Sequence, residues 1–238
     1  MKIAIMQPYF LPYIGYWQLI NTVDTFVVYD NIQFSKSGWF HRNNILVNGT
    51  RTLFTIPLKK DSDYLDVRDR KLSDSSNIEI NKIISRIKNN YKKAPYFNDV
   101  FPLIQDIFLF SEKNLFEYIL NSITKICSYL EIKTPILKSS DVHIDHSLRS
   151  QNKVIAISKA LKADIYINPI GGVSLYDKNT FKNYKVELLF LKAEMIEYSQ
   201  FCSTFEPYLS IIDVMMFNNI ATIQKMLTRF KLDGEHHV

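Results

Sequence analysis

The stretch that decides the fold is Ile3-Ala4-Ile5-Met6-Gln7-Pro8-Tyr9-Phe10-Leu11-Pro12-Tyr13-Ile14-Gly15-Tyr16-Trp17-Gln18-Leu19-Ile20. Its first residues form an apolar run typical of a buried strand, and the two prolines and the glycine that follow prevent the strand from continuing. After Gly15 the apolar residues fall at helical spacing. Because open α/β sheets place ligands at the carboxyl ends of their strands, the stretch predicts a strand, a binding loop and a helix.

Four polar side chains in this stretch suit a ligand cleft. Gln7 stands at the end of the predicted strand, and Tyr9, Tyr13 and Tyr16 follow it. A phenol combines an apolar ring with a polar tip, which is typical of the lining of a binding site. An aromatic loop that only packs in the core fits the pattern nearly as well. We expect these four residues to bind substrate.

Composition favours a globular α/β protein. The chain has 238 residues, of which 47% are hydrophobic, so it can bury one sizeable core. We expect a single α/β domain over residues 1–238, although two domains fit the length equally well. No transmembrane segment or leader is expected, and the two cysteines, Cys127 and Cys202, are too few for a disulfide framework. These features predict a cytoplasmic protein.

The net charge of +5 suits phosphate-bearing partners, which include nucleotides, nucleotide-sugars, RNA and anionic lipids.

The densest polar and aromatic cluster lies at residues 32–44, directly after a second predicted strand that ends at Asp30. A β-hairpin around Asn48-Gly49 is expected to hold this cluster. A histidine ordinarily titrates near neutrality, so we expect His41 to be a catalytic base, with Asp30 as a second catalytic residue. A His41 that is only hydrogen-bonded within the hairpin fits equally well. The other residues of the cluster that we expect to bind substrate are Gln33, Lys36, Trp39, Arg42 and Asn43.

The rest of the chain alternates helices and strands. Residues 78–130 carry helical periodicity, interrupted at residues 94–96 and near Phe101-Pro102, and are expected to form a helical insertion or cover. A helix over residues 150–162 and strands over residues 163–168 and 186–191 follow. This alternation predicts a Rossmann-like, mostly parallel sheet. Alternating Asp and His residues at 141–146 lack partners at a recognisable ligand spacing, so no metal site is expected.

Two further polar segments occur after these strands. Gly171-Gly172 follows a strand, where glycine allows the backbone either to approach a ligand closely or to turn tightly. Ser210 stands at a plausible helix N-cap, and Asp213 follows at the spacing of a capping box. Capping is the simpler explanation of both.

Four motifs occur in order along nearly the whole chain. They are Gln-Pro-x-Phe-x-Pro-x-x-Gly-Tyr at residues 7–16, Gly-Trp-Phe-His-Arg-Asn at 38–43, Gly-Gly to Leu-Tyr-Asp at 171–177, and Tyr-x-Gln to Leu-Ser-Ile-Ile-Asp at 198–213. Together they closely resemble the WbqC-like protein family. The resemblance implies a role in the biosynthesis of O-antigen and other surface polysaccharides, and transfer of glycine onto an amino sugar is one activity suggested for that family. The substrate-binding residues expected in the last two motifs are Gly171, Gly172, Tyr176, Asp177, Tyr198, Gln200, Ser210 and Asp213.

Residues 6–16 are also similar, more faintly, to the strand, loop and helix of nucleotidyltransferases and pantothenate synthetases. Those enzymes carry a His-x-x-His or His-x-Gly-His signature on a Rossmann-like sheet, and Tyr13 and Tyr16 stand here where they have histidines. A neutral phenol offers only a hydrogen bond to a phosphate, so the fold can be shared without the ATP chemistry.

We therefore expect a transferase that joins an amino acid such as glycine to the amine of a nucleotide-linked or lipid-linked amino sugar. His41 is the expected base, Lys36 and Arg42 the expected phosphate ligands, and Gln7 and Asn43 are expected to orient the substrate. The acyl donor must arrive activated, as an adenylate or an aminoacyl-tRNA. ATP with magnesium is a further candidate cofactor. The alternatives are a sugar or nucleotidyl transferase, with Asp30 and Asp177 near a metal, and a non-catalytic protein that binds a nucleotide-sugar.

Overall fold

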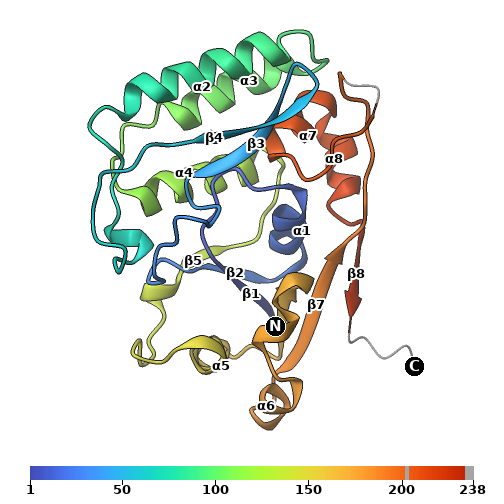
Figure 1. Cartoon of the computed structure of the whole chain (residues 1–238). Coiled ribbons are helices and arrows are strands. Elements are labelled where there is room, and N and C mark those ends of the chain that lie inside the picture. The colour runs from blue at the N-terminus through green and yellow to red at the C-terminus, as the bar shows by residue number, and fades with distance from the viewer. Residues whose placement is uncertain (202–203, 234–238) are drawn as a thin grey trace.

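The centre of the molecule is a six-stranded sheet in the order β5-β2-β1-β6-β7-β8 (Figure 1). The structure is a computed structural model that describes residues 1–201 and 204–233, so Cys202 lies outside the described residues. All neighbouring strands run parallel except β8, which is antiparallel to β7. The fold is therefore Rossmann-like α/β, as the alternation of helices and strands predicts. The strands are β1 (Lys2–Met6), β2 (Thr25–Val28), β5 (Ile136–Lys138), β6 (Ile165–Pro169), β7 (Glu187–Ala193) and β8 (Phe230–Asp233).

Side chains alternate along the strands because successive residues point to opposite faces of the sheet. Ile3 and Ile5 of β1 pack with Val154 of α5 (Ser150–Ala160) and Phe181 of α6 (Lys178–Asn183). Ala4 belongs to a larger core on the opposite face. Both faces of β1 are therefore buried, which explains why its sequence is a continuous apolar run.

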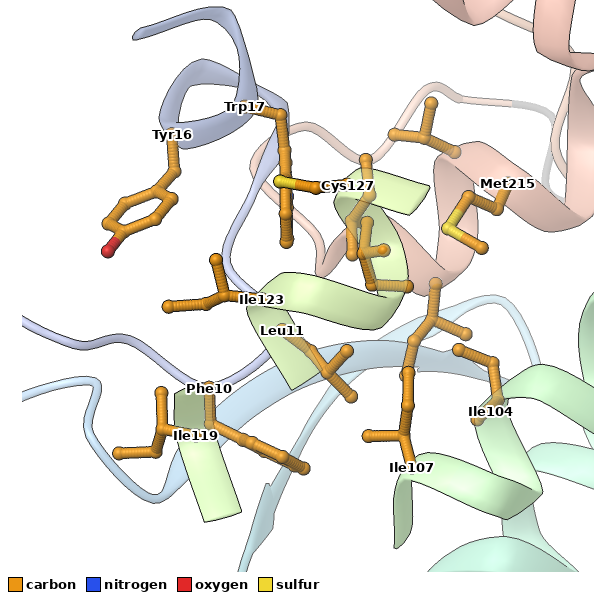
Figure 2. Packing of buried hydrophobic residues seen from close by; sticks show 14 of the residues in the cluster. Phe10, Leu11, Tyr16, Trp17, Ile104, Ile107, Ile119, Ile123, Cys127 and Met215 are labelled. Carbon is orange, nitrogen blue, oxygen red and sulfur yellow. The ribbon is translucent and has the colours of Figure 1, made fainter. Parts of the chain in front are cut away.

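The larger core is covered by helices and by the separate hairpin of β3 (Arg42–Val47) and β4 (Thr50–Thr55). Figure 1 shows α2 and α3 next to this hairpin, and Figure 2 shows side chains of the loop after β1 meeting those of α1, α3, α4 and α7. The hairpin turns at Asn48 and Gly49, whose φ angles are 50° and 76°, as the dipeptide predicts. The helices on this face are α1 (Ile14–Thr22), α2 (Ser76–Tyr91), α3 (Phe97–Phe108), α4 (Leu115–Tyr129), α7 (Ile211–Phe217) and α8 (Ile220–Met226).

The predicted interruption near Phe101-Pro102 is wrong, because α3 continues through Pro102. Proline removes one backbone hydrogen bond from a helix. Pro102 is exposed, whereas Val100, Ile104 and Ile107 of the same helix are fully buried, so the packing of the apolar face outweighs the lost bond. The break at residues 94–96 is confirmed, since α2 ends at Tyr91 and α3 begins at Phe97. Within the described residues, each helix is too short or too polar to cross a membrane.

Candidate functional site

The sheet changes its winding direction between β1 and β6, because β2 and β5 lie on one side of β1 and β6, β7 and β8 on the other. β1 pairs with β2 at four positions, but with β6 only at Lys2–Ile165 and Ile3–Tyr166. Their carboxyl ends are therefore not joined by further strand pairing. Open α/β sheets bind ligands at such a switch point. A cleft of about 810 Å³ opens there, lined by the ends of β1, β2 and β6, the starts of α1 and α5, and parts of the segments 64–66 and 171–176.

The loop after β1 brings Gln7, Tyr9, Tyr13 and Tyr16 to the cleft, and their binding of substrate stays a prediction. The Tyr9 hydroxyl donates to Gln7 Oε1 at 3.0 Å, and the buried Tyr16 hydroxyl donates to the Gln7 carbonyl oxygen at 3.0 Å. Burial raises the pKa of the Tyr16 phenol well above its ordinary value. The Gln7 amide N–H groups have no protein partner in the described part of the chain, so they are free to donate to a ligand.

Asn43 and Ser210 support this loop from behind and do not line the cleft. Leu11 has a φ of 46°, a conformation that a residue with a side chain rarely adopts. Its carbonyl oxygen accepts from Asn43 Nδ2 at 2.8 Å and from Ser210 Oγ at 2.7 Å. Both side chains are buried, and Ser210 also caps α7. They hold the unusual backbone in place.

Asp213, Tyr198 and Gln200 form a second supporting group away from the cleft. Asp213 is fully buried, and its carboxylate accepts from Tyr198 Oη at 2.8 Å, Gln200 Nε2 at 2.7 Å and Tyr91 Oη at 2.8 Å. Burial raises the pKa of Asp213, although these three hydrogen bonds oppose the shift. The contacts join the segment before α7 to α2.

Ile32 and Gln33 are the residues of the 32–44 cluster that line the cleft, and Gln33 Nε2 donates to the Asp63 carbonyl oxygen at 3.0 Å. Lys36 pairs with the Asp63 carboxylate at 2.8 Å on the surface. Arg42 lies 5.7 Å from the Trp39 ring and donates to the Gly38 carbonyl oxygen at 3.1 Å. The phosphate-binding roles of Lys36 and Arg42 stay predictions.

His41 also lies outside the lining of the cleft. Its ring packs against Phe34, with the ring centroids 5.4 Å apart, and its buried Nδ1 has no partner among the described residues. Burial, aided by the nearby charges of Arg42 and Arg70, lowers the pKa of His41 to about 4. The imidazole is therefore neutral at physiological pH, and its role as a base stays a prediction.

The two acids proposed near a metal are engaged elsewhere. Asp30 Oδ1 accepts from Ser139 Oγ at 2.7 Å and from the Ser140 N–H at 2.9 Å. Burial alone raises the pKa of Asp30, but hydrogen bonds to the carboxylate outweigh it and the pKa lies below its ordinary value. Asp177 caps α6 by accepting from the Thr180 N–H at 2.7 Å. Neither acid lines the cleft, and residues 1–201 and 204–233 contain no group of three or more His, Cys, Asp or Glu placed to hold a metal ion.

Gly171, Gly172 and Tyr176 lie on the wall of the cleft that follows β6. The two glycines differ in their surroundings. A Cβ on Gly172 would lie 2.0 Å from Asn168 Nδ2, whereas a Cβ on Gly171 would meet no atom within 4 Å. Gly172 is therefore required for close packing against Asn168.

Sequence reasoning missed several residues that line the cleft, namely Asn31, Asp66, Arg149, Lys153 and Asn168. Asn31 and Asn168 come at or just after the ends of strands, which is a signal that the sequence does carry. Arg149 stands directly before the helix predicted over residues 150–162 and Lys153 lies in its first turn, so the two residues, four apart, fall on the same side of it. Asp66 lies in an irregular segment without any such signal.

Comparison with known proteins agrees with the four motifs. The sequence model of the WbqC-like protein family matches residues 7–225. The chain belongs to the WbqC-like protein family. It is 26% identical over 221 residues to a protein of Mycobacterium tuberculosis (strain ATCC 25618 / H37Rv) named "Uncharacterized protein Rv1507c". The aligned region covers 91% of this chain and 93% of that protein. No solved structure is significantly similar to the chain. The family match includes every candidate site residue.

The cleft of this WbqC-like protein collects groups with different chemical abilities. Gln7 supplies amide N–H donors, Asp66 a carboxylate, and Arg149 and Lys153 two cations. Tyr13 and Tyr64 supply ring surfaces, with Tyr64 86% exposed at the mouth. Such a set can bind a polar, anionic ligand and place a donor and an acceptor beside its reacting atoms.

Proposed function

We propose that this WbqC-like protein is a transferase of surface-polysaccharide biosynthesis that joins an amino acid such as glycine to the amine of a nucleotide-linked or lipid-linked amino sugar. The observation that carries the proposal is the free amide of Gln7 in the cleft at the switch point of the sheet. Acyl transfer needs a donor of this kind at the developing oxyanion. Membership of the family supplies the polysaccharide context.

The reaction joins the amine nitrogen of the sugar to the acyl carbon of an activated amino acid. The bond from that carbon to the phosphate or ribose oxygen of the donor breaks, and that oxygen leaves with the electron pair. We assign the proton of the attacking amine to Asp66 in place of His41, because Asp66 lines the cleft and His41 does not. The Asp66 carboxylate lies 3.7 Å from the Arg68 guanidinium. We assign stabilisation of the oxyanion to the Gln7 amide N–H groups. The Tyr9 hydroxyl donates to the amide oxygen of Gln7, so the N–H groups point to the other side, away from Tyr9.

The test is a search for the amide product by mass spectrometry. The purified protein is incubated with UDP- or dTDP-linked amino sugars and one of three donor systems: glycyl-adenylate, glycyl-tRNA, or free glycine with ATP and magnesium. We expect a glycyl amide of the amino sugar with at least one donor. Gln7→Ala should lower kcat by about 100-fold, the usual cost of losing one oxyanion donor. Asp66→Asn should lower kcat by about 100-fold or more, as for a lost general base.

Asp63→Asn is the matched control, because Asp63 lies on the same segment but pairs with Lys36 at the surface. It should keep the wild-type rate. Sugar-nucleotide binding without product under any donor would contradict the transferase and favour the non-catalytic binding protein. Release of pyrophosphate with a nucleotide joined to the sugar would instead favour nucleotidyl transfer.

A further inference from the structure

Lys153 is a buried cation that forms no ion pair with a described residue, although the carboxylates of Asp66 and Asp30 attract it from a distance. Its side chain lies on α5, and the residue is only 2% exposed. None of the ion pairs in residues 1–201 and 204–233 includes Lys153. A buried charge that lacks a partner costs free energy, so such a site calls for a compensating group.

The hydrogen bonds of Lys153 leave one donor unused. Nζ donates to Asn31 Oδ1 at 3.2 Å and to the Asn31 carbonyl oxygen at 3.4 Å, and it lies 5.1 Å from the centroid of the Tyr29 ring. An ammonium group carries three N–H donors. These two acceptors leave the ammonium group at the wall of the cleft with capacity for one more acceptor.

Arg149 adds a second cation to the same wall. It is the N-cap residue of α5, and its carbonyl oxygen accepts from the Lys153 N–H at 3.4 Å, so the two residues lie one turn apart. Arg149 is exposed, and no described residue forms a side-chain hydrogen bond or ion pair with it. Burial, and after it the positive charge of Arg149, lowers the pKa of Lys153, while the carboxylates of Asp66 and Asp30 partly oppose the shift. The positive charges of Arg149 and Lys153 therefore repel one another across this part of the cleft.

The cleft is positively charged where these residues meet. Arg149 and Lys153 are opposed by one lining carboxylate, Asp66, which already lies 3.7 Å from the Arg68 guanidinium. The remaining lining residues are neutral. The two lining cations outnumber this carboxylate, so this end of the cleft favours a ligand that carries negative charge.

We propose that Arg149 and Lys153 bind the diphosphate of the sugar substrate. The inference rests on the proposed function of the cleft, and it deepens that function by naming the group that is recognised. A diphosphate diester carries two negative charges, which match the two cations. An arginine fork binds two phosphate oxygens at once, while a lysine acts as a compact point charge. Nucleotide-linked and lipid-linked sugars share this diphosphate.

The test is isothermal titration calorimetry on the full-length protein with four probes. They are UDP-N-acetylglucosamine, UDP, farnesyl diphosphate and free N-acetylglucosamine. We expect the three diphosphate compounds to bind and the free sugar to bind at least about 100-fold more weakly, since it cannot form the charge-assisted hydrogen bonds. Tighter binding of UDP-N-acetylglucosamine would assign the site to nucleotide-linked sugars, and tighter binding of farnesyl diphosphate to lipid-linked sugars.

Substitutions locate the diphosphate. Arg149→Gln and Lys153→Met should each raise the Kd of UDP by about 10-fold or more, which is the size expected for one lost charge-assisted contact. Arg149 is exposed, so its variant should fold normally even if Lys153→Met does not. Lys159→Met is the matched control, because Lys159 lies in the last turn of the same helix, outside the cleft and 5.2 Å from the Tyr184 ring. It should bind UDP as wild type does.

Equal binding of UDP by wild type, Arg149→Gln and Lys153→Met would overturn the inference, as would equal binding of UDP and the free sugar. The outcome is separate from the proposed function. If the glycyl amide forms but Arg149→Gln keeps the wild-type KM and UDP affinity, the inference fails and the transferase stands. If diphosphate binding depends on both cations but no amide forms, the transferase fails and the diphosphate site stands.

Discussion

The Tyr9 hydroxyl donates a hydrogen bond of 3.0 Å to the amide oxygen of Gln7. The two residues are two positions apart on one loop, and this hydrogen bond fixes which end of the Gln7 amide faces a ligand. With Oε1 occupied, the N–H groups of Gln7 remain the donors available in the cleft. Tyr9 is itself held by ring contacts, with its centroid 5.9 Å from that of Tyr16 and 6.0 Å from that of Phe40.

Tyr9→Phe should therefore lower kcat clearly while lowering the free energy of unfolding only slightly. Without the hydroxyl, the Gln7 amide can rotate by half a turn and present its oxygen to the oxyanion. We expect kcat to fall by about 10-fold with KM nearly unchanged, and the free energy of unfolding to fall by about 1 kcal/mol. Steady-state kinetics and urea unfolding measure the two effects. Tyr184→Phe, at an exposed tyrosine outside the cleft, is the control. A change in KM alone would show that Tyr9 only binds the sugar.

The adjacent glycines after β6 should respond differently to alanine. In Gly172→Ala the new methyl group would lie 2.0 Å from Asn168 Nδ2, and Asn168 is buried and hydrogen-bonded to Tyr166 at 3.0 Å. We expect this variant to lose about 1–3 kcal/mol of unfolding free energy, as overpacked sites do. Gly171→Ala meets open space and should be neutral or gain about 0.4–1 kcal/mol by restricting the unfolded chain. Thermal unfolding compares the two, and equal losses would contradict the packing argument.

The order of elements could be predicted where local chemistry decides it. Pro8 and Pro12 lie in the first loop, between the end of β1 at Met6 and the start of α1 at Ile14, and Asn48-Gly49 makes the hairpin turn, so these features follow from neighbouring residues alone. The sequence does not predict β5 and β8, which are three and four residues long and contain no fully buried residue. β2 is as short as β8, but three of its four residues are buried, so it carries an apolar run that the sequence shows.

The site could be predicted only in part, for a similar reason. Gln7 and Gly172 stand at the ends of strands, where any parallel sheet places ligands, so their position at the cleft follows from the pattern. Arg149 and Lys153 lie on a helix whose orientation depends on how it packs against the sheet, which no local signal gives. The motifs also do not show which of their residues line the cleft and which only support the residues that do. Asn43 is of the second kind, because its side chain donates to the carbonyl oxygens of the first loop from behind.

His41 should make the protein less stable as the pH falls. Its pKa is about 4 in the folded protein, against about 6.5 when unfolded, so between these values the unfolded chain binds more protons. Stability is therefore retained above about pH 6.5 and is lost as the pH falls towards 4. We expect a loss of about 1–2 kcal/mol, because solvent partly screens the ring. Urea unfolding from pH 7 to 4.5 measures it.

His41→Gln removes this titration and should flatten that part of the pH dependence. His143→Gln is the control, because His143 is exposed. If wild type and His41→Gln lose stability in parallel as the pH falls, the buried imidazole is not the cause.

Asp213 should matter for stability and not for the affinity of the cleft. Its carboxylate accepts three hydrogen bonds inside the protein, from Tyr91, Tyr198 and Gln200. Asp213→Ala removes the acceptor of all three, so we expect a loss of about 2–4 kcal/mol of unfolding free energy with an unchanged Kd for UDP. A weaker Kd with unchanged stability would contradict this supporting role and place Asp213 in the binding site.

The pH dependence of Asp213 has the opposite sign to that of His41. Because burial raises the pKa of the folded carboxyl above 3.8, the folded protein binds more protons than the unfolded chain between 3.8 and that raised pKa. The contribution of Asp213 to stability is therefore full below pH 3.8 and falls as the pH rises through the raised pKa. Asp213→Asn cannot titrate, so the advantage of wild type over this variant should shrink from pH 4 to pH 7 in urea unfolding. A constant difference would mean that hydrogen bonds to the charged carboxylate fully offset its burial.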